Sequence, residues 1–265
     1  MLAEPERTPY DLRFRLLGFP VRVHPWFWIG TALFGGEILQ VLGIAYFAVW
    51  VGVVFVSILV HELGHALAFR RFGADADIVL YAFGGLAVPT FAISGRGRRI
   101  LIALAGPVAG FILAGIVYAS NQASPWAFVR PVGQPWPKMP SVTDFLYDSL
   151  MFVNVGWGIL NLLPVFPLDG GQVSREVCGI AWGPRGKRIS LQISFVLALV
   201  LVAYSLVCAL DGRGALTKEL PTWLPQGSFW TAILFGMLAV SSYQLLQQPD
   251  WTEDHWDDDR PPWKR

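Results

Sequence analysis

Apolar stretches separated by short polar segments run along most of the chain. Residues 100–118, 189–210 and 229–246 are predominantly apolar, and each is about long enough to cross the ~30 Å hydrocarbon core of a bilayer as a helix. Residues 45–69 form a fourth long stretch, whose first sixteen residues carry no charge. The pattern predicts an all-α polytopic membrane protein.

Two further stretches are weaker candidates for membrane spans. Residues 25–42 are interrupted by Gly35, Gly36 and Glu37, which favours a short or broken helix. Residues 150–163 are shorter and end in a proline-rich segment. Counting both, we expect about six transmembrane helices.

The composition supports the membrane placement and excludes one class of partner. Hydrophobic residues make up 54% and charged residues 15% of the 265 residues, with 12 Trp, which is outside the usual range of a soluble domain. The net charge is +1, and no basic face interleaved with aromatic residues suggests nucleic acid as a partner. The composition therefore predicts an integral membrane protein.

Lys and Arg residues are unevenly distributed between the expected spans. Sixteen of the twenty lie in the N-terminal segment, the second and fourth loops and the C-terminal segment. By the positive-inside rule, both termini are cytoplasmic and the number of spans is even. We therefore expect a cytoplasmic N-terminal segment (1–24) that is not a cleaved signal peptide, a transmembrane domain (25–246) and an acidic cytoplasmic tail (247–265).

The strongest chemical motif is His61-Glu62-Leu-Gly-His65, in the last third of the 45–69 stretch. On a helix, His61 and His65 are one turn apart on one face, so their imidazoles can share a metal ion while Glu62 reaches the water that the metal activates. Such a pattern also arises by chance on soluble helices, but ionisable groups inside a membrane are costly and usually functional. The motif predicts an intramembrane zinc site.

The predicted topology brings one carboxylate to the depth of the two histidines. If the helix enters from outside near residue 45, His61 lies about 24 Å along it, roughly 6 Å short of the cytoplasmic boundary. The fourth expected span runs in the same direction and leads to Asp169, an acceptable third zinc ligand. The alternative is a turn aspartate before Gly170 and Gly171.

Together, the 61–65 motif and the sequence Asn-x-x-Pro-x-x-Pro-Leu-Asp-Gly at 161–170 resemble the site-2 protease family of intramembrane zinc metalloproteases, over roughly residues 45–175. An amide near such an active site can stabilise a developing oxyanion. The resemblance implies that Zn²⁺ is bound by His61, His65 and Asp169, that Glu62 is the catalytic base, and that Asn161 lies near the active site.

Two more segments fit the resemblance. A small membrane-associated β-hairpin is predicted after the motif helix, with strands at 78–83 and 86–89 and Gly84 and Gly85 as the turn. The edge of this hairpin could hold an unwound substrate strand. A surface hairpin is the alternative. Residues 105–110 resemble the Gly-Pro motif of the family's third core helix and favour close helix packing.

The chain also departs from the family's pattern. Gly110 stands where the family often has asparagine, which puts a polar contact from this helix in doubt. Asn154, about two helical turns before Asn161, either shares its role or forms a hydrogen bond between helices. The loops and tail are too short for a PDZ domain or nucleotide-sensing repeats, so we expect a minimal form.

We therefore expect a zinc metalloendopeptidase that cleaves a peptide bond in or near the transmembrane segment of single-pass or other membrane proteins. The expected location is the plasma membrane of a prokaryotic cell, with the active site near the cytoplasmic side. The alternatives are a membrane zinc transporter, since intramembrane ligands also mark ion pathways, and a non-catalytic relative acting as a binding protein. Residues 189–210 and 229–246 contain no His or carboxylate, which favours the protease.

Overall fold

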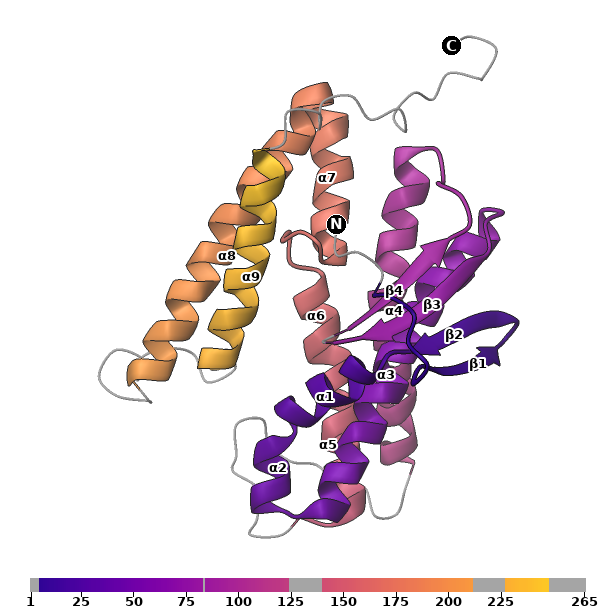
Figure 1. Cartoon of the computed structure of the whole chain (residues 1–265), viewed down its shortest axis with the longest axis vertical. Helices are drawn as coiled ribbons and strands as arrows, with labels where there is room; N and C mark the ends of the chain where they lie inside the picture. Colours follow the sequence, from indigo (N-terminus) through magenta and orange to yellow (C-terminus); the bar gives the residue numbers. More distant parts are fainter. Residues whose placement is uncertain (1–4, 83, 124–139, 212–226, 248–265) are drawn as a thin grey trace. The chain divides into compact units, whose positions relative to one another are not determined.

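The computed structural model describes residues 5–82, 84–123, 140–211 and 227–247 (Figure 1). The described residues form two compact units, one up to Asn161 and the other from Leu162 onwards. The predicted division at residues 24 and 246 remains a prediction.

The first unit contains a four-stranded sheet in the order β1-β2-β3-β4. Strands β1 and β2 are antiparallel, β2 runs parallel to β3 with Val21 opposite Ile78, and β3 and β4 are antiparallel. The strands are β1 (Leu12–Leu16), β2 (Phe19–Val23), β3 (Ala76–Tyr81) and β4 (Gly84–Pro89).

The β1–β2 hairpin lies in the segment 1–24, for which no strand was predicted. Leu17 and Gly18 connect the two strands with φ angles of 51° and 86°, the positive values that a two-residue turn needs to match the twist of its strands. The alternation of apolar and arginine side chains over Leu12–Leu16 is the period-two signal of a strand. The expectation of an all-α fold was therefore incomplete.

The hairpin after the motif helix is present, but the predicted position of its turn was wrong. Gly84 and Gly85 belong to β4, where they pair with Tyr81 and Leu80. A side chain on Gly85 would collide with Glu62, because an added Cβ would lie 2.3 Å from the Glu62 Cγ. This glycine thus serves close approach to a helix and not a turn.

Helices and one face of the sheet form the core of the first unit. Side chains of β2 and β3 pack against Phe27 and against Ile58, Leu59 and Ala66, which flank the motif. The sheet therefore supports the same helix that carries the histidines. The helical elements of this unit are α1 (Pro25–Phe34), α2 (Gly36–Val41), α3 (Ile44–Arg71), α4 (Arg96–Gln122), α5 (Val142–Met151), the π-helical η1 (Phe152–Gly156) and α6 (Trp157–Asn161).

Residues 25–42 form a broken helix, as the glycine pair indicated. Helix α1 ends at Phe34, and α2 starts at Gly36. At Gly35, an added Cβ would lie 2.5 Å from the Trp50 ring of α3. The break therefore lets the chain pass close to α3, and neither piece is long enough to span a bilayer.

The second unit is built from helices α7 (Asp169–Trp182), α8 (Gly186–Asp211) and α9 (Phe229–Leu246), with the short 3₁₀ helix η2 (Gly183–Arg185) between the first two. Helices α8 and α9 run side by side (Figure 1). Large apolar side chains such as Val196 and Met237 are exposed on them, as expected for helices that face lipid.

Four of the described helical stretches are long and apolar enough to cross a membrane: Ile44–Arg71, Arg96–Gln122, Asp169–Asp211 and Phe229–Leu246. They contain the four long stretches of the sequence analysis. The residues 150–163 continue from α5 through η1 into α6 and do not reach this criterion among the described residues. The expectation of six spans therefore stays a prediction. Of the predicted acidic tail (247–265), residues 248–265 lie outside the described residues.

Candidate metal centre

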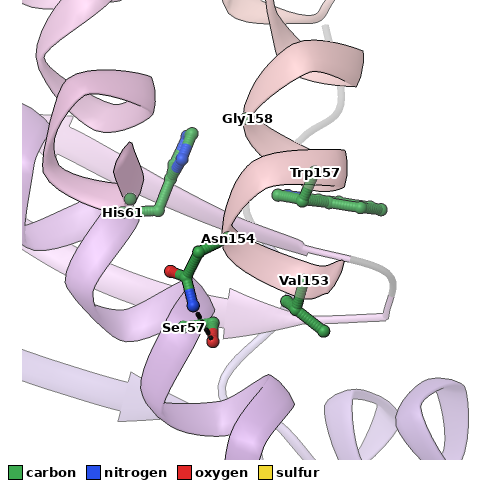
Figure 2. A pocket seen from close by; sticks show the side chains of 7 residues that line it. Ser57, His61, Val153, Asn154, Trp157 and Gly158 are labelled. Carbon is green, nitrogen blue, oxygen red and sulfur yellow. Dashed lines mark hydrogen bonds between the residues drawn. The ribbon is translucent and has the colours of Figure 1, made fainter. Parts of the chain in front are cut away.

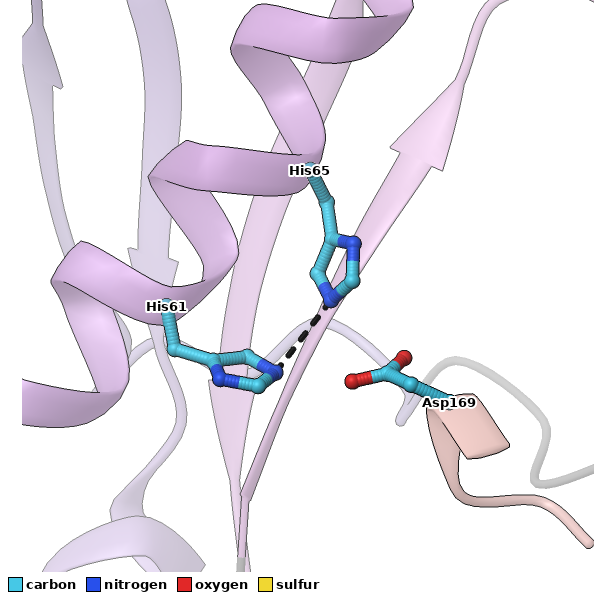
Figure 3. Close-up of side chains that lie close together, drawn as sticks. All are labelled: His61, His65 and Asp169. Carbon is cyan, nitrogen blue, oxygen red and sulfur yellow. Dashed lines mark hydrogen bonds between the residues drawn. The ribbon is translucent and has the colours of Figure 1, made fainter. Parts of the chain in front are cut away.

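Helix α3 places His61 and His65 on one face of a single continuous helix. The helix runs for 28 residues, so the four-residue spacing of the motif becomes one helical turn, as predicted. Both imidazoles are buried, and their Nε2 atoms lie 3.2 Å apart (Figure 3). Two nitrogens held ~2.0–2.1 Å from a tetrahedral zinc ion would lie about 3.3 Å apart. The pair is therefore spaced as zinc requires.

A backbone carbonyl orients the ring of His65. Its Nδ1 lies 2.7 Å from the carbonyl oxygen of Ile102 on α4. Because a carbonyl only accepts, His65 Nδ1 donates this hydrogen bond, and Nε2 keeps its lone pair for a metal ion. Such bonds to the second ring nitrogen usually accompany metal-binding histidines.

Helix α4 approaches the two histidines through glycine and alanine. A Cβ added to Gly106 would lie 2.2 Å from His65 Nε2 and 2.7 Å from His61 Nε2. One at Gly64 would lie 2.4 Å from the Ala105 carbonyl oxygen. Small residues permit this approach, so the expected close packing of the Gly-Pro helix is present.

Glu62 is buried on α3 and lies against β4 at Gly85. The glutamate thus lies beside an edge strand, because β4 pairs only with β3 among the described strands. Neither the contact at Gly85 nor that at Gly106 was predicted as part of the site. A glycine pair in a strand pattern and the Gly-Pro motif were the available signals.

Asp169 is the first residue of α7 and is buried. One potential ligand atom each from His61, His65 and Asp169 lies within 4.8 Å of the others (Figure 3). Two imidazoles with one carboxylate are a donor set used by catalytic zinc sites, which leave a fourth position open. The three residues fit a zinc site.

The two asparagines of the fourth expected span lie at different positions. Asn161 is buried at the end of α6, and its Nδ2 donates to the Trp157 carbonyl oxygen over 3.0 Å. Asn154 lies in η1, and its Nδ2 donates to Ser57 Oγ on α3 over 2.9 Å. A hydrogen bond between helices, one of the two roles predicted for Asn154, is therefore present.

A small pocket lies beside His61, between α3, α4 and the η1–α6 segment (Figure 2). The Oδ1 of Asn154 is buried and has no hydrogen-bond partner within the described part of the chain. Gly110 leaves room there, since an added Cβ would come within 3.7 Å of that oxygen. The pocket is lined by Ser57, His61, Gly110, Val153, Asn154, Trp157 and Gly158.

These features define a membrane protein with a buried His-Glu-His motif at a cluster of side chains that fits a zinc site. Comparison with known proteins identifies the family. The sequence profile of peptidase family M50 matches residues 48–150 and 134–201, and the chain belongs to this family, which includes the site-2 proteases. The apolar helices and this family together indicate an integral membrane protein.

Several curated proteins are similar in sequence. A zinc metalloprotease of Methanocaldococcus jannaschii is 29% identical over 202 residues, covering 75% of this chain and 55% of that protein. A putative zinc metalloprotease of Synechocystis is 27% identical, covering 83% and 55%. The putative zinc metalloprotease Rip3 of Mycobacterium tuberculosis is 30% identical, covering 72% and 50%. The chain therefore spans about half the length of these relatives.

The fold is similar to that of a site-2 protease from Methanocaldococcus jannaschii. The two structures superpose with a TM-score of 0.57 at 23% sequence identity, covering 90% of this chain and 96% of the other. This likeness supports the fold.

Proposed function

We propose that the protein is an intramembrane zinc metalloprotease that hydrolyses a peptide bond in or near the transmembrane segment of another membrane protein. The observation that carries the proposal is the buried Glu62 next to a histidine pair spaced for zinc, on a helix apolar enough to span a bilayer. Membership of a peptidase family supports the same reaction.

In this proposal, His61, His65 and Asp169 hold the zinc ion. When bound, zinc lowers the pKa of a water molecule and polarises the carbonyl group of the substrate. Glu62 accepts the proton of the attacking water and then donates a proton to the leaving amine. Glu62 is buried beside the histidine pair, where few water molecules compete for its carboxylate.

Asn161 is proposed to stabilise the negative charge that develops on the carbonyl oxygen. An amide nitrogen carries two N–H groups, and the hydrogen bond to Trp157 uses one of them. The second N–H remains to donate to an oxyanion.

The edge of β4 is proposed to hold the substrate in an extended conformation. A peptide bond in a helix is shielded, and a strand pulled out of the helix needs partners for its backbone groups. Adding it to an exposed sheet edge satisfies them. Contact between Gly85 of β4 and Glu62 would bring such a strand to the catalytic base.

The proposed orientation has both termini and the active site at the cytoplasmic side of the plasma membrane of a prokaryotic cell. The support is the distribution of Lys and Arg residues. Protein substrates would then be cut near their cytoplasmic boundary, where water can reach Glu62.

The decisive experiment is co-expression of tagged single-pass membrane proteins with the wild type or Glu62→Gln, read as a size shift of the tag. Glu37→Gln, an exposed change on α2, is the matched control. We expect a cleavage product with the wild type and the control and none with Glu62→Gln, while all three proteins bind zinc. Cleavage by Glu62→Gln would refute its role as the base, and a wild type that binds no zinc would refute the proposed function.

A further inference from the structure

Two serines are buried in the apolar helices α8 and α9. Ser194 is 1% exposed and Ser242 is 0% exposed, and their Oγ atoms lie 2.7 Å apart. Hydroxyl groups buried among apolar side chains are costly unless they form hydrogen bonds. The pair therefore does more than fill space between two helices.

The serine pair continues to a backbone amide outside both helices. Phe166 N–H donates to Ser194 Oγ over 2.7 Å. Because an amide N–H can only donate, the Ser194 oxygen accepts this bond, and its own proton is available for Ser242. The result is a short relay from Phe166 to Ser194 to Ser242.

Phe166 lies in the turn that precedes Asp169. Pro164 and Pro167 in this turn have no N–H group, and the N–H groups of Val165 and Leu168 donate to the carbonyl oxygens of Leu163 and Val165. In the turn 164–168, the amide of Phe166 is thus the donor that reaches another helix.

The turn and the start of α7 are packed backbone against backbone. A Cβ added to Gly170 would lie 2.1 Å from the Leu162 carbonyl oxygen, and one at Gly171 would lie 2.6 Å from the Phe166 nitrogen. A shift of Phe166 therefore displaces the first turn of α7, whose first residue is Asp169.

We propose that Ser194 and Ser242 are positioning residues for the Asp169 carboxylate. The last two helices supply no His or carboxylate within residues 189–210 and 229–246, and their hydroxyl groups instead fix the turn that presents Asp169. This inference rests on the proposed function, since it assumes that Asp169 holds the zinc ion.

The test measures zinc affinity of the full chain in lipid nanodiscs by competition with a chromophoric chelator, beside thermal unfolding of the metal-free protein. The variants are Ser194→Ala, Ser242→Ala and the double mutant. Two matched controls are Ser205→Ala, a buried serine on α8, and Ser241→Ala, whose hydroxyl bonds to the Met237 carbonyl oxygen of its own helix.

We expect Ser194→Ala to weaken zinc binding about 10-fold or more, in the range seen when outer partners of metal ligands are removed. Ser242→Ala should have a smaller effect. The double mutant should bind zinc no more weakly than Ser194→Ala, because Ser242 acts only through Ser194. The controls should stay within about 2-fold, and Ser194→Thr, which keeps the hydroxyl, should recover most of the affinity.

The outcomes separate this inference from the proposed function. Zinc affinity of Ser194→Ala within about 2-fold of the wild type would refute the relay, even if the metal-free protein unfolds at a lower temperature. Additive effects of the two substitutions would refute it as well. Failure of the wild type to bind zinc would remove both the proposed function and the inference, whereas Glu62-dependent cleavage with an unaffected Ser194→Ala would remove the inference alone.

Discussion

His61 and His65 are held by a single element, whereas Asp169 is held by contacts between segments far apart in the chain. The histidines need only the continuity of α3, with the Ile102 carbonyl group and Gly106 from the neighbouring α4. The aspartate begins a helix, follows a turn with two prolines, and depends on glycine contacts and on Ser194.

This difference separates local from tertiary determinants of a metal site. A helix fixes the spacing of its side chains as soon as it forms. A turn that contains two prolines forms few backbone hydrogen bonds of its own and must obtain much of its rigidity from other elements. Asp169 is therefore the proposed ligand whose position is most open to change by distant substitutions.

Removal of a proposed ligand, either a histidine of α3 or Asp169, should have the largest effect on zinc binding. We expect His61→Ala and Asp169→Ala each to lower zinc affinity by at least about 100-fold. Removal of a residue that only forms a hydrogen bond to a metal ligand already lowers affinity by up to about 100-fold. Glu62→Gln should retain zinc, because the glutamate is the proposed base and is not among the proposed ligands. The zinc content of each purified variant after dialysis against a chelator measures how well the variant retains zinc. Full zinc occupancy in Asp169→Ala would show that zinc binding does not need the carboxylate. The contrast between Asp169 and the histidine pair would then have no bearing on the metal site.

A methyl group placed on α4 should displace the rings of His61 and His65 without unfolding the protein. Gly106→Ala would place a Cβ 2.2 Å from His65 Nε2, and the end of a side chain can yield where backbone cannot. We expect zinc affinity to fall about 10-fold or more through displacement of the ring, with a small change in unfolding temperature. Isothermal titration with zinc measures the first quantity.

Gly115→Ala is the matched control on the same helix, because an added Cβ there has no atom of another element within 4 Å in the described part of the chain. Alanine favours a helix over glycine by roughly 0.5–1 kcal/mol, so this variant should be slightly more stable and bind zinc normally. Normal zinc binding by Gly106→Ala would mean that the rings have more room than the contacts indicate.

The same contrast explains how much the sequence could predict. The spacing of His61 and His65 and the four long apolar stretches were predicted because they depend on local periodicity. Asp169 was predicted as a candidate ligand from its chemistry, but nothing in the local pattern of Ser194 or Ser242 indicates contact with its turn. Gly85 was assigned to a turn because a glycine pair between apolar runs is a turn signal, and its approach to Glu62 is a tertiary contact.

The hydrogen bond between Asn154 and Ser57 tests whether zinc binding by the histidine pair depends on contacts between α3 and other helices. Ser57 lies one turn before His61 on α3 and accepts from Asn154 Nδ2 over 2.9 Å. Such bonds in membrane proteins contribute on average about 0.6 kcal/mol. A double-mutant cycle with Ser57→Ala and Asn154→Ala, followed by thermal unfolding in detergent, should give a coupling of that size. Zinc affinity should change by less than about 3-fold, since both histidines remain on α3. A coupling near zero would mean that the bond adds nothing to stability.

The smallest effect on zinc binding is expected from substitutions in the N-terminal hairpin, which belongs to the sheet beside α3 and contributes no proposed ligand. Burial raises the pKa of Asp11, but hydrogen bonds from the hydroxyl and amide groups of Thr8 and from Arg22 outweigh it and hold the pKa well below its ordinary value. The ionised form is thus favoured in the folded protein, and its contribution is complete above the unfolded-state pKa of about 4 and is lost as the pH falls below it.

Asp11→Asn should remove this pH dependence, so that amide protection of β1 and β2 in hydrogen exchange at neutral pH is lower than in the wild type and no longer decreases between about pH 5 and pH 2. Zinc affinity at neutral pH should remain within about 2-fold of the wild type, because α3 fixes the spacing of His61 and His65 without the hairpin. A loss of zinc affinity above about 5-fold would contradict the comparison. It would mean that the sheet packed against Ile58 and Ala66 holds the histidine pair as much as the serine relay holds Asp169.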